Sequence, residues 1–90
     1  MTSIGSVVVY PNPNNGEFTI RGSMRSRTDD DVAIEVTNMM GQVVYKDLSK
    51  TRNGVLDAHV KTSGNLPNGM YIITLHSGSE SKVCHFVLEQ

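Results

Sequence analysis

The sequence predicts an all-β domain, an antiparallel β-sandwich of about seven short strands. Three observations favour this fold. Short apolar runs alternate with polar residues at a period of two, turn residues separate the runs, and no window has a convincing helical period. Such spacing is typical of two packed sheets with immunoglobulin-like architecture. The Cys–Trp–Cys core of antibody domains is absent, because the chain has one Cys and no Trp.

The composition narrows the class of protein. Ninety residues correspond to one domain, and 38% hydrophobic with 19% charged residues is typical of a globular chain. A net charge of −1 gives no support to a nucleic-acid or anionic-membrane partner. The longest apolar runs are about five residues, well below the roughly 20 that span a bilayer. Residues 1–6 lack the regions of a signal peptide, so we expect an added start or a linker there and the domain over 7–90.

Four strands are expected in the first half of the chain, at residues 7–10, 16–21, 32–37 and 42–48. Between the first two, Pro11, Pro13 and Gly16 define a stiff, turning connection. Alternation places Phe18 and Ile20 on the inward side of the second strand. These features predict that the chain reverses direction sharply after residue 10.

The third and fourth strands form a predicted hairpin. It follows a polar segment, residues 22–31, which we expect to be an exposed loop. Val32, Ile34 and Val36 form the inward face of the third strand, and residues 38–41 form a tight turn with Gly41 in the left-handed region. The fourth strand carries the apolar residues Val43, Val44 and Tyr45.

Three further strands are expected in the second half, at residues 55–60, 71–76 and 82–88, after a turn at Asn53-Gly54 and before a hairpin at 77–79. The inward residues are predicted to be Leu56, Ala58 and Val60, and then Cys84, Phe86 and Leu88. Pro67 fixes a corner and Gly69 permits a backbone angle that a side chain would resist. Both faces of the strand at 71–76 are largely apolar, which predicts a central strand packed on both sides.

The sequence predicts no catalytic, cofactor or metal site, and the domain is interpreted as not being an enzyme. His59, His76 and His85 lack a ligand spacing and are interpreted as half-exposed strand residues. Asp29, Asp30 and Asp31 lack the EF-hand pattern and are expected in a solvated loop. Turn formation accounts for Asn12, Asn14 and Asn15. Cys84 is expected to be a buried, inert thiol. Met39 and Met40 are expected at a turn tip, either exposed or tucked under the sheet.

Four segments of the chain, at residues 9–18, 36–44, 65–71 and 82–88, carry a family resemblance. They resemble, in order, the Tyr-Pro-Asn-Pro…Gly opening, the central hairpin, the Leu-Pro-x-Gly-x-Tyr element and the terminal strand of one family. This family is the C-terminal sorting domain, or secretion signal domain, of type IX secretion system cargo proteins, of the class called type A. The chain departs from many members by ending Leu88-Glu89-Gln90 instead of with basic residues.

The resemblance implies an immunoglobulin-like sandwich appended to secreted enzymes, adhesins and surface proteins of Gram-negative bacteria. It implies that outer-membrane translocon components recognise the domain after an N-terminal cargo domain has folded. A cell-surface sortase then usually removes it. The implied location is the periplasm in transit, followed by the cell surface or secretion.

Five positions are predicted to matter for recognition: Gly69, Tyr71, Lys82, Phe86 and Val87. The first two are expected to act through fold and local shape and the others through direct contact, with the last strand adding to a partner sheet edge. A second interpretation is a passive stalk or a carbohydrate-binding accessory module of a cell-surface enzyme. A third is an enzyme, which would need a pocket that contains two or more of His59, His76, His85 and the loop at Asp29 to Asp31.

Overall fold

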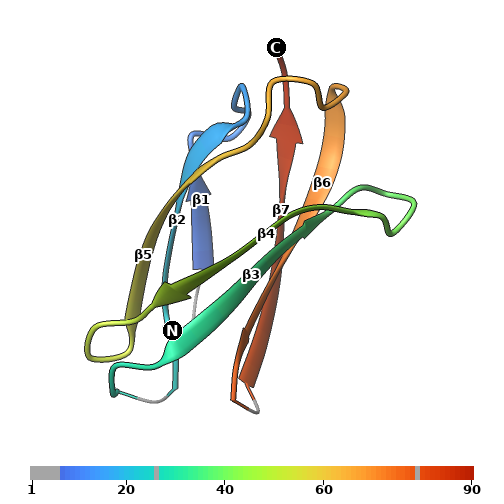
Figure 1. Cartoon of the computed structure of the whole chain (residues 1–90). Coiled ribbons are helices and arrows are strands. Elements are labelled where there is room, and N and C mark those ends of the chain that lie inside the picture. Colours follow the sequence, from blue (N-terminus) through green and yellow to red (C-terminus); the bar gives the residue numbers. More distant parts are fainter. Residues whose placement is uncertain (1–6, 26, 79) are drawn as a thin grey trace.

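Seven β-strands form two antiparallel sheets in the computed structural model of the chain (Figure 1). The structure describes residues 7–25, 27–78 and 80–90. The strands are β1 Val7–Tyr10, β2 Glu17–Ser23, β3 Asp31–Thr37, β4 Val43–Lys50, β5 Val55–Lys61, β6 Gly69–Ser77 and β7 Glu80–Leu88. The predicted start or linker at 1–6, Ser26 of the predicted loop and Ser79 of the predicted hairpin lie outside the described residues.

The order of the strands confirms the predicted immunoglobulin-like β-sandwich. One sheet has the order β1-β2-β5 and the other β4-β3-β6-β7. Antibody constant domains likewise place the first, second and fifth strands in one sheet and the third, sixth and seventh in the other. The difference concerns the fourth strand, which pairs with β3 here instead of with the fifth strand.

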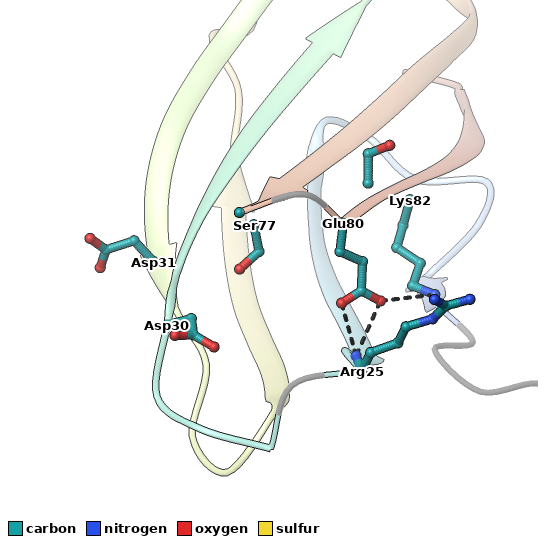
Figure 2. A pocket seen from close by; sticks show the side chains of 8 residues that line it. Arg25, Asp30, Asp31, Ser77, Glu80 and Lys82 are labelled. Atoms are coloured by element: carbon teal, nitrogen blue, oxygen red, sulfur yellow. Dashed lines mark hydrogen bonds and ion pairs between the residues drawn. The ribbon is translucent and has the colours of Figure 1, made fainter.

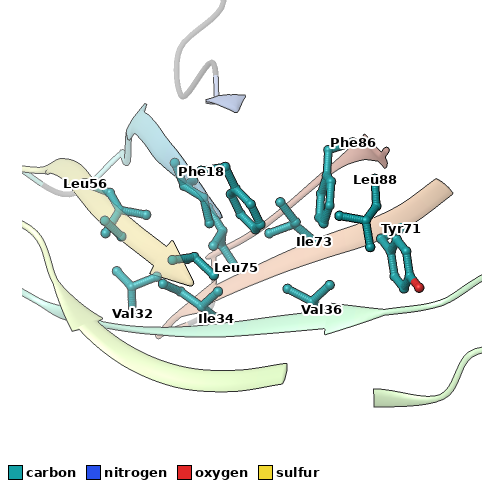
Figure 3. Packing of buried hydrophobic residues seen from close by; sticks show 13 residues of the cluster. Phe18, Val32, Ile34, Val36, Leu56, Tyr71, Ile73, Leu75, Phe86 and Leu88 are labelled. Atoms are coloured by element: carbon teal, nitrogen blue, oxygen red, sulfur yellow. The ribbon is translucent and has the colours of Figure 1, made fainter. Parts of the chain in front are cut away.

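The core lies between the two sheets (Figure 3). It is built from alternate residues of five strands: Phe18 and Ile20, Val32, Ile34 and Val36, Leu56, Ala58 and Val60, Tyr71, Ile73 and Leu75, Phe86 and Leu88. The Phe18 and Phe86 ring centroids lie 4.5 Å apart and join the two sheets. Because removal of apolar surface from water is the main force that favours folding, this alternation fixes which face of each strand points inward.

Six of the seven strands extend one or two residues further than predicted at an end. β2 continues to Ser23, which pairs with Val55, and β4 continues to Lys50, which pairs with Asp31. Part of the predicted exposed loop is also buried, since Met24 is only 5% exposed and its N–H donates to the Gly54 carbonyl at 2.7 Å. The extra residues are held by backbone pairing, which polar side chains do not signal.

The prediction that β6 packs on both faces is wrong. β6 is an interior strand in its hydrogen bonding, because it pairs with β3 on one side and β7 on the other. Only the face with Tyr71, Ile73 and Leu75 is buried, whereas Met70 on the opposite face is 43% exposed and Ile72 is half-buried. A two-layer sandwich has one interior, so the second apolar face of β6 points outward.

Candidate functional site

The loop at residues 11–16 lies against the end of β7. The Asn12 Oδ1 accepts a hydrogen bond from the Val87 N–H at 2.9 Å, and the Asn14 N–H donates to the Val87 carbonyl at 3.0 Å. The Glu89 N–H donates to the Asn14 carbonyl at 2.7 Å, and Asn14 forms a parallel bridge with Leu88. The loop therefore covers the outer backbone edge of β7 where this strand ends.

The same loop is tied together internally. Asn14 is 5% exposed; its Nδ2 donates to the Pro11 carbonyl at 3.0 Å, and its Oδ1 accepts from the Gly16 N–H at 2.9 Å. Gly16 has φ of +104°, and a Cβ there would lie 2.8 Å from the Thr62 Oγ1. Both the backbone angle and the close approach favour glycine at this position. Pro11 and Pro13 flank the exposed Asn12.

A second loop, which leads into β6, reaches the same end of the sandwich. The buried Tyr71 donates its hydroxyl to the Pro67 carbonyl at 2.6 Å. This is the tyrosine corner of immunoglobulin-like sandwiches, in which a Tyr near the start of the sixth strand bonds back to the chain a few residues upstream. Gly69 has φ of +150°, and a Cβ there would meet nothing within 4 Å, so the backbone angle alone favours glycine.

The last described residue is also held by this second loop. The Gln90 N–H donates to the Asn68 Oδ1 at 2.9 Å, and the Gln90 Nε2 donates to the Leu66 carbonyl at 2.8 Å. Both loops therefore form hydrogen bonds with residues 87–90. We refer to residues 11–16, 66–70 and 87–90 together as the C-terminal pole, the end of the sandwich marked C in Figure 1.

A shallow apolar groove of about 270 Å³ adjoins the C-terminal pole. Its described lining carries no charged side chain and consists of Asn38, Met39, Met40, Val44, Pro67, Asn68, Gly69, Met70 and Tyr71. Met39 and Met40 are 64% and 83% exposed, so the turn tip presents them to solvent instead of tucking them under the sheet. The turn itself has the predicted geometry, since Gly41 donates its N–H to the Asn38 carbonyl and has φ of +86°.

Four of the five predicted recognition residues gather at this pole. Pairing of β6 with β7 places Gly69 opposite Leu88 and Tyr71 opposite Phe86, with Val87 between them. The Phe86 side chain is only 1% exposed and stacks 5.7 Å from the Tyr71 ring, so in the folded domain it acts through packing and offers no surface for direct contact. Val87 is half-buried and Gly69 is exposed.

Lys82 lies at the opposite end of β7 and does not join the other four. Lys82 pairs with Leu75 of β6. It lies six residues before Leu88 in β7, a separation of about 20 Å along an extended strand. Its Nζ lies 3.3 Å from the Glu80 Oε2, and the two side chains are only 18% and 15% exposed. The Arg25 N–H also donates to the Glu80 carboxylate, at 2.9 and 3.1 Å (Figure 2). Lys82 is thus committed to a local ion pair in a polar pocket of about 780 Å³.

The histidines and the acidic loop do not form a shared site. His59, His76 and His85 are all exposed, and the His59 Nε2 lies 2.8 Å from the Glu17 Oε2. The Asp29 Oδ1 accepts from the Asn53 N–H at 2.8 Å, which fastens the acidic loop to the turn between β4 and β5. Among the described residues, no group of three or more His, Cys, Asp or Glu side chains could hold a metal ion.

Cys84 faces the core side of β7 as predicted, but it is half-buried instead of fully buried. Burial nevertheless raises the pKa of the Cys84 thiol from 9.0 to about 11. Because the thiolate is the reactive form, Cys84 is a poor nucleophile at neutral pH. The thiol therefore packs against the core and provides no chemistry for a site.

Asn12, Asn14 and Asn68 are the functional candidates that sequence reasoning missed. Turn formation accounts for Asn15, whose Oδ1 accepts from the Glu17 N–H two residues later, at 3.3 Å. It does not account for Asn12, whose carboxamide bonds to a residue 75 positions away. The signal in the sequence was the repetition of Asn beside proline in both turn segments.

Comparison with known proteins adds a family to this geometry. A family model described as the secretion system C-terminal sorting domain matches residues 8–89, essentially the whole chain. No match was found among curated proteins. Within the described residues, no helix has the length and apolar character needed to cross a membrane.

Proposed function

The chain belongs to the family of type IX secretion C-terminal sorting domains, and from this we propose that it directs a folded cargo protein through the outer-membrane translocon. The observation that carries the proposal is the family match over residues 8–89. It is supported by the convergence of both family-like loops on the end of β7. The family is a sorting signal and not a catalyst, and it implies export toward the cell surface or secretion.

The direction of the chain supports recognition at the C-terminal pole. Val7 pairs with Gly22 near the end of β2, whereas Tyr10, at the other end of β1, leads into the loop on β7. β1 therefore runs toward the pole at which the chain ends (Figure 1). Any cargo that precedes Val7 therefore joins β1 at its end away from the pole. We expect the pole to stay accessible to translocon components.

The edge of β7 limits how a partner strand adds to this domain. Within the described residues, β7 is hydrogen-bonded along its length to β6 only, and β1 also contacts β7. Val87 turns its N–H and carbonyl toward the loop at 11–16, and by alternation Ser81, Val83 and His85 point theirs the same way. The loop occupies the outward groups of Val87 and Glu89. We therefore expect any strand addition to use the part of β7 before Val87, a shorter stretch than the whole strand that the sequence suggested.

The carbohydrate-binding alternative has little support from the aromatic residues. Sugar-binding platforms present exposed rings for stacking, whereas Phe18, Phe86 and Tyr71 are at most 3% exposed. Tyr45 is half-buried, and Tyr10 is the most exposed ring at 48%. The enzyme alternative is weaker still, because the polar pocket at the far end contains Asp30 and Asp31 without a histidine.

The proposal is tested by fusing the full chain behind a reporter that folds in the periplasm of a type IX-competent bacterium. We expect the reporter to reach the cell surface or the medium, and to stay in the periplasm of a matched strain that lacks the translocon. Retention in the periplasm of the competent strain would refute the proposed function. Binding of the purified chain to a glycan array above background would favour the carbohydrate-binding alternative.

A further inference from the structure

We infer that Asn12 and Asn68 are positioning residues. Their side-chain hydrogen bonds, which we call the clamp, hold residues 87–90 in the conformation that the secretion machinery recognises. The signal is then a composite surface of three chain segments and not a linear tag in the last strand. This inference rests on the proposed function and adds to it the residues that hold the recognised surface together. Its support is the set of hydrogen bonds at the C-terminal pole.

The end of the chain depends on the loops because β6 does not reach it. β6 begins at Gly69, which pairs with Leu88, so Glu89 and Gln90 extend past their neighbouring strand. The bond to the Asn14 carbonyl holds the Glu89 N–H, and the bond to the Asn68 Oδ1 holds the Gln90 N–H. These long-range bonds therefore replace strand pairing for the last two residues.

The two asparagine side chains act from different sheets. Asn12 precedes β2 in the three-stranded sheet, and Asn68 precedes β6 in the four-stranded sheet. Their Oδ1 atoms accept from the backbone N–H groups of Val87 and Gln90, each at 2.9 Å. The clamp therefore forms only when both sheets have assembled. The recognised surface is thus complete only in the folded domain.

The side chains of this surface indicate which kind of partner it can bind. Apart from Glu89, residues 11–16, 66–70 and 87–90 carry no ionisable side chain, and the adjoining groove has no charged lining. Such a surface presents amide groups and apolar methionines. A partner that fits it is a protein surface without charge, which binds through shape complementarity and short hydrogen bonds.

The test uses the full chain with Asn12→Ala and Asn68→Ala, singly and together. Asn65→Ala is the matched control, since Asn65 is an exposed asparagine that lies outside the C-terminal pole. Asn12→Asp is the conservative control because it keeps an acceptor oxygen facing Val87. Amide hydrogen exchange measured by NMR reports the clamp, and the secreted fraction of the fused reporter reports recognition.

We expect Asn12→Ala to speed exchange of the Val87 amide and Asn68→Ala that of the Gln90 amide, each about tenfold, with Ile73 unchanged. The double variant should lower the secreted fraction about tenfold, while Asn65→Ala stays near the parent chain and Asn12→Asp, which keeps the acceptor oxygen, restores most of the secretion lost in Asn12→Ala. Unchanged exchange at both amides would overturn the clamp. Faster exchange with undiminished secretion would overturn its role in recognition alone. Failure of the parent chain to be secreted would instead refute the proposed function and the inference together.

Discussion

The Tyr71 hydroxyl links the interior of the sandwich to the loop that holds Gln90. The ring packs against Phe86 in the core, and the O–H reaches the Pro67 carbonyl beside Asn68. Sequence reasoning found Tyr71 and Gly69 through turn and strand preferences, and the structure shows what those residues do in space. Their importance for recognition remains a prediction, and it follows from shape, because the Tyr71 side chain is only 3% exposed.

Substitution of Tyr71 by Phe removes the hydroxyl and leaves the Pro67 carbonyl without this partner. We expect the free energy of unfolding to fall by about 1 kcal/mol, the usual net value of such a bond. Urea denaturation with an unchanged m-value measures it. Tyr45→Phe is the control, because the Tyr45 hydroxyl bonds to the exposed Asp47 carboxylate and should contribute about 0.5 kcal/mol or less. Equal effects of the two substitutions would contradict the expected contribution of the Tyr71–Pro67 hydrogen bond to stability.

Gly16→Ala tests the loop that covers β7. The new Cβ would stand 2.8 Å from the Thr62 Oγ1 at a φ of +104°, so we expect a destabilisation of roughly 1–3 kcal/mol. Gly64→Ala is the matched control, since a Cβ there would meet nothing within 4 Å and its φ is not in the left-handed region. Chemical denaturation of both variants gives the comparison. A loss at Gly64 as large as that at Gly16 would rule out this account of the loop.

Cys84 should react slowly in the folded domain. Burial raises the pKa of its thiol from 9.0 to about 11, so at one pH the thiolate fraction is about a hundredfold lower than in the unfolded chain. Alkylation followed by mass spectrometry at pH 8, with and without urea, measures the difference. The same shift lowers stability as the pH rises from about 9 to 11, because the unfolded thiol loses its proton first. Labelling at the same rate in both states would exclude this burial effect.

The strands show which parts of the fold a single sequence reveals. Alternation identified the inward residues of β2, β3 and β5, because one side of each of these strands is clearly apolar. It failed for β6, whose two faces look alike until the sandwich supplies only one interior. It also missed the ends of β2 and β4, where pairing to Val55 and Asp31 depends on strands that are distant in sequence.

The candidate site was harder to predict than the strands. Residues 11–16 and 65–69 were recognised as turns, but nothing local to them indicates that both contact residues 87–90. That meeting depends on strand order, which places the start of β2 and the start of β6 beside the end of β7. Lys82 was grouped with Phe86 and Val87 because it shares their strand, although extended geometry places it near the opposite end.

Amide exchange along β7 tests the covered edge directly in the unaltered chain. The His85 and Val87 amides point the same way, but only that of Val87 reaches an acceptor, the Asn12 Oδ1, among the described residues. We expect the His85 amide to exchange at least about tenfold faster than that of Val87. NMR exchange rates, corrected for intrinsic sequence effects, provide the measurement. Similar rates would show that the loop does not protect the edge.

For the molecule as a whole, the feature that bears most on recognition is where the start of β1, the polar pocket and the C-terminal pole lie relative to one another. The chain enters β1 away from the C-terminal pole, and the polar pocket with Lys82 also lies away from it. The pole contains the covered end of β7 and the loop held by the tyrosine corner, and the exposed methionine turn adjoins it. Under the proposed function, this arrangement would let a folded cargo before β1 and a partner at the C-terminal pole contact the domain at once.

The measurement that tests this account most directly is the secreted fraction of a reporter with the C-terminal pole open or covered. In both fusions the reporter precedes the full chain; in one, a second folded protein also follows Gln90, and circular dichroism confirms that the β-sandwich is intact. The account predicts that the open fusion leaves the cell and that the covered fusion stays in the periplasm. Equal secretion of the two fusions would contradict recognition at this pole.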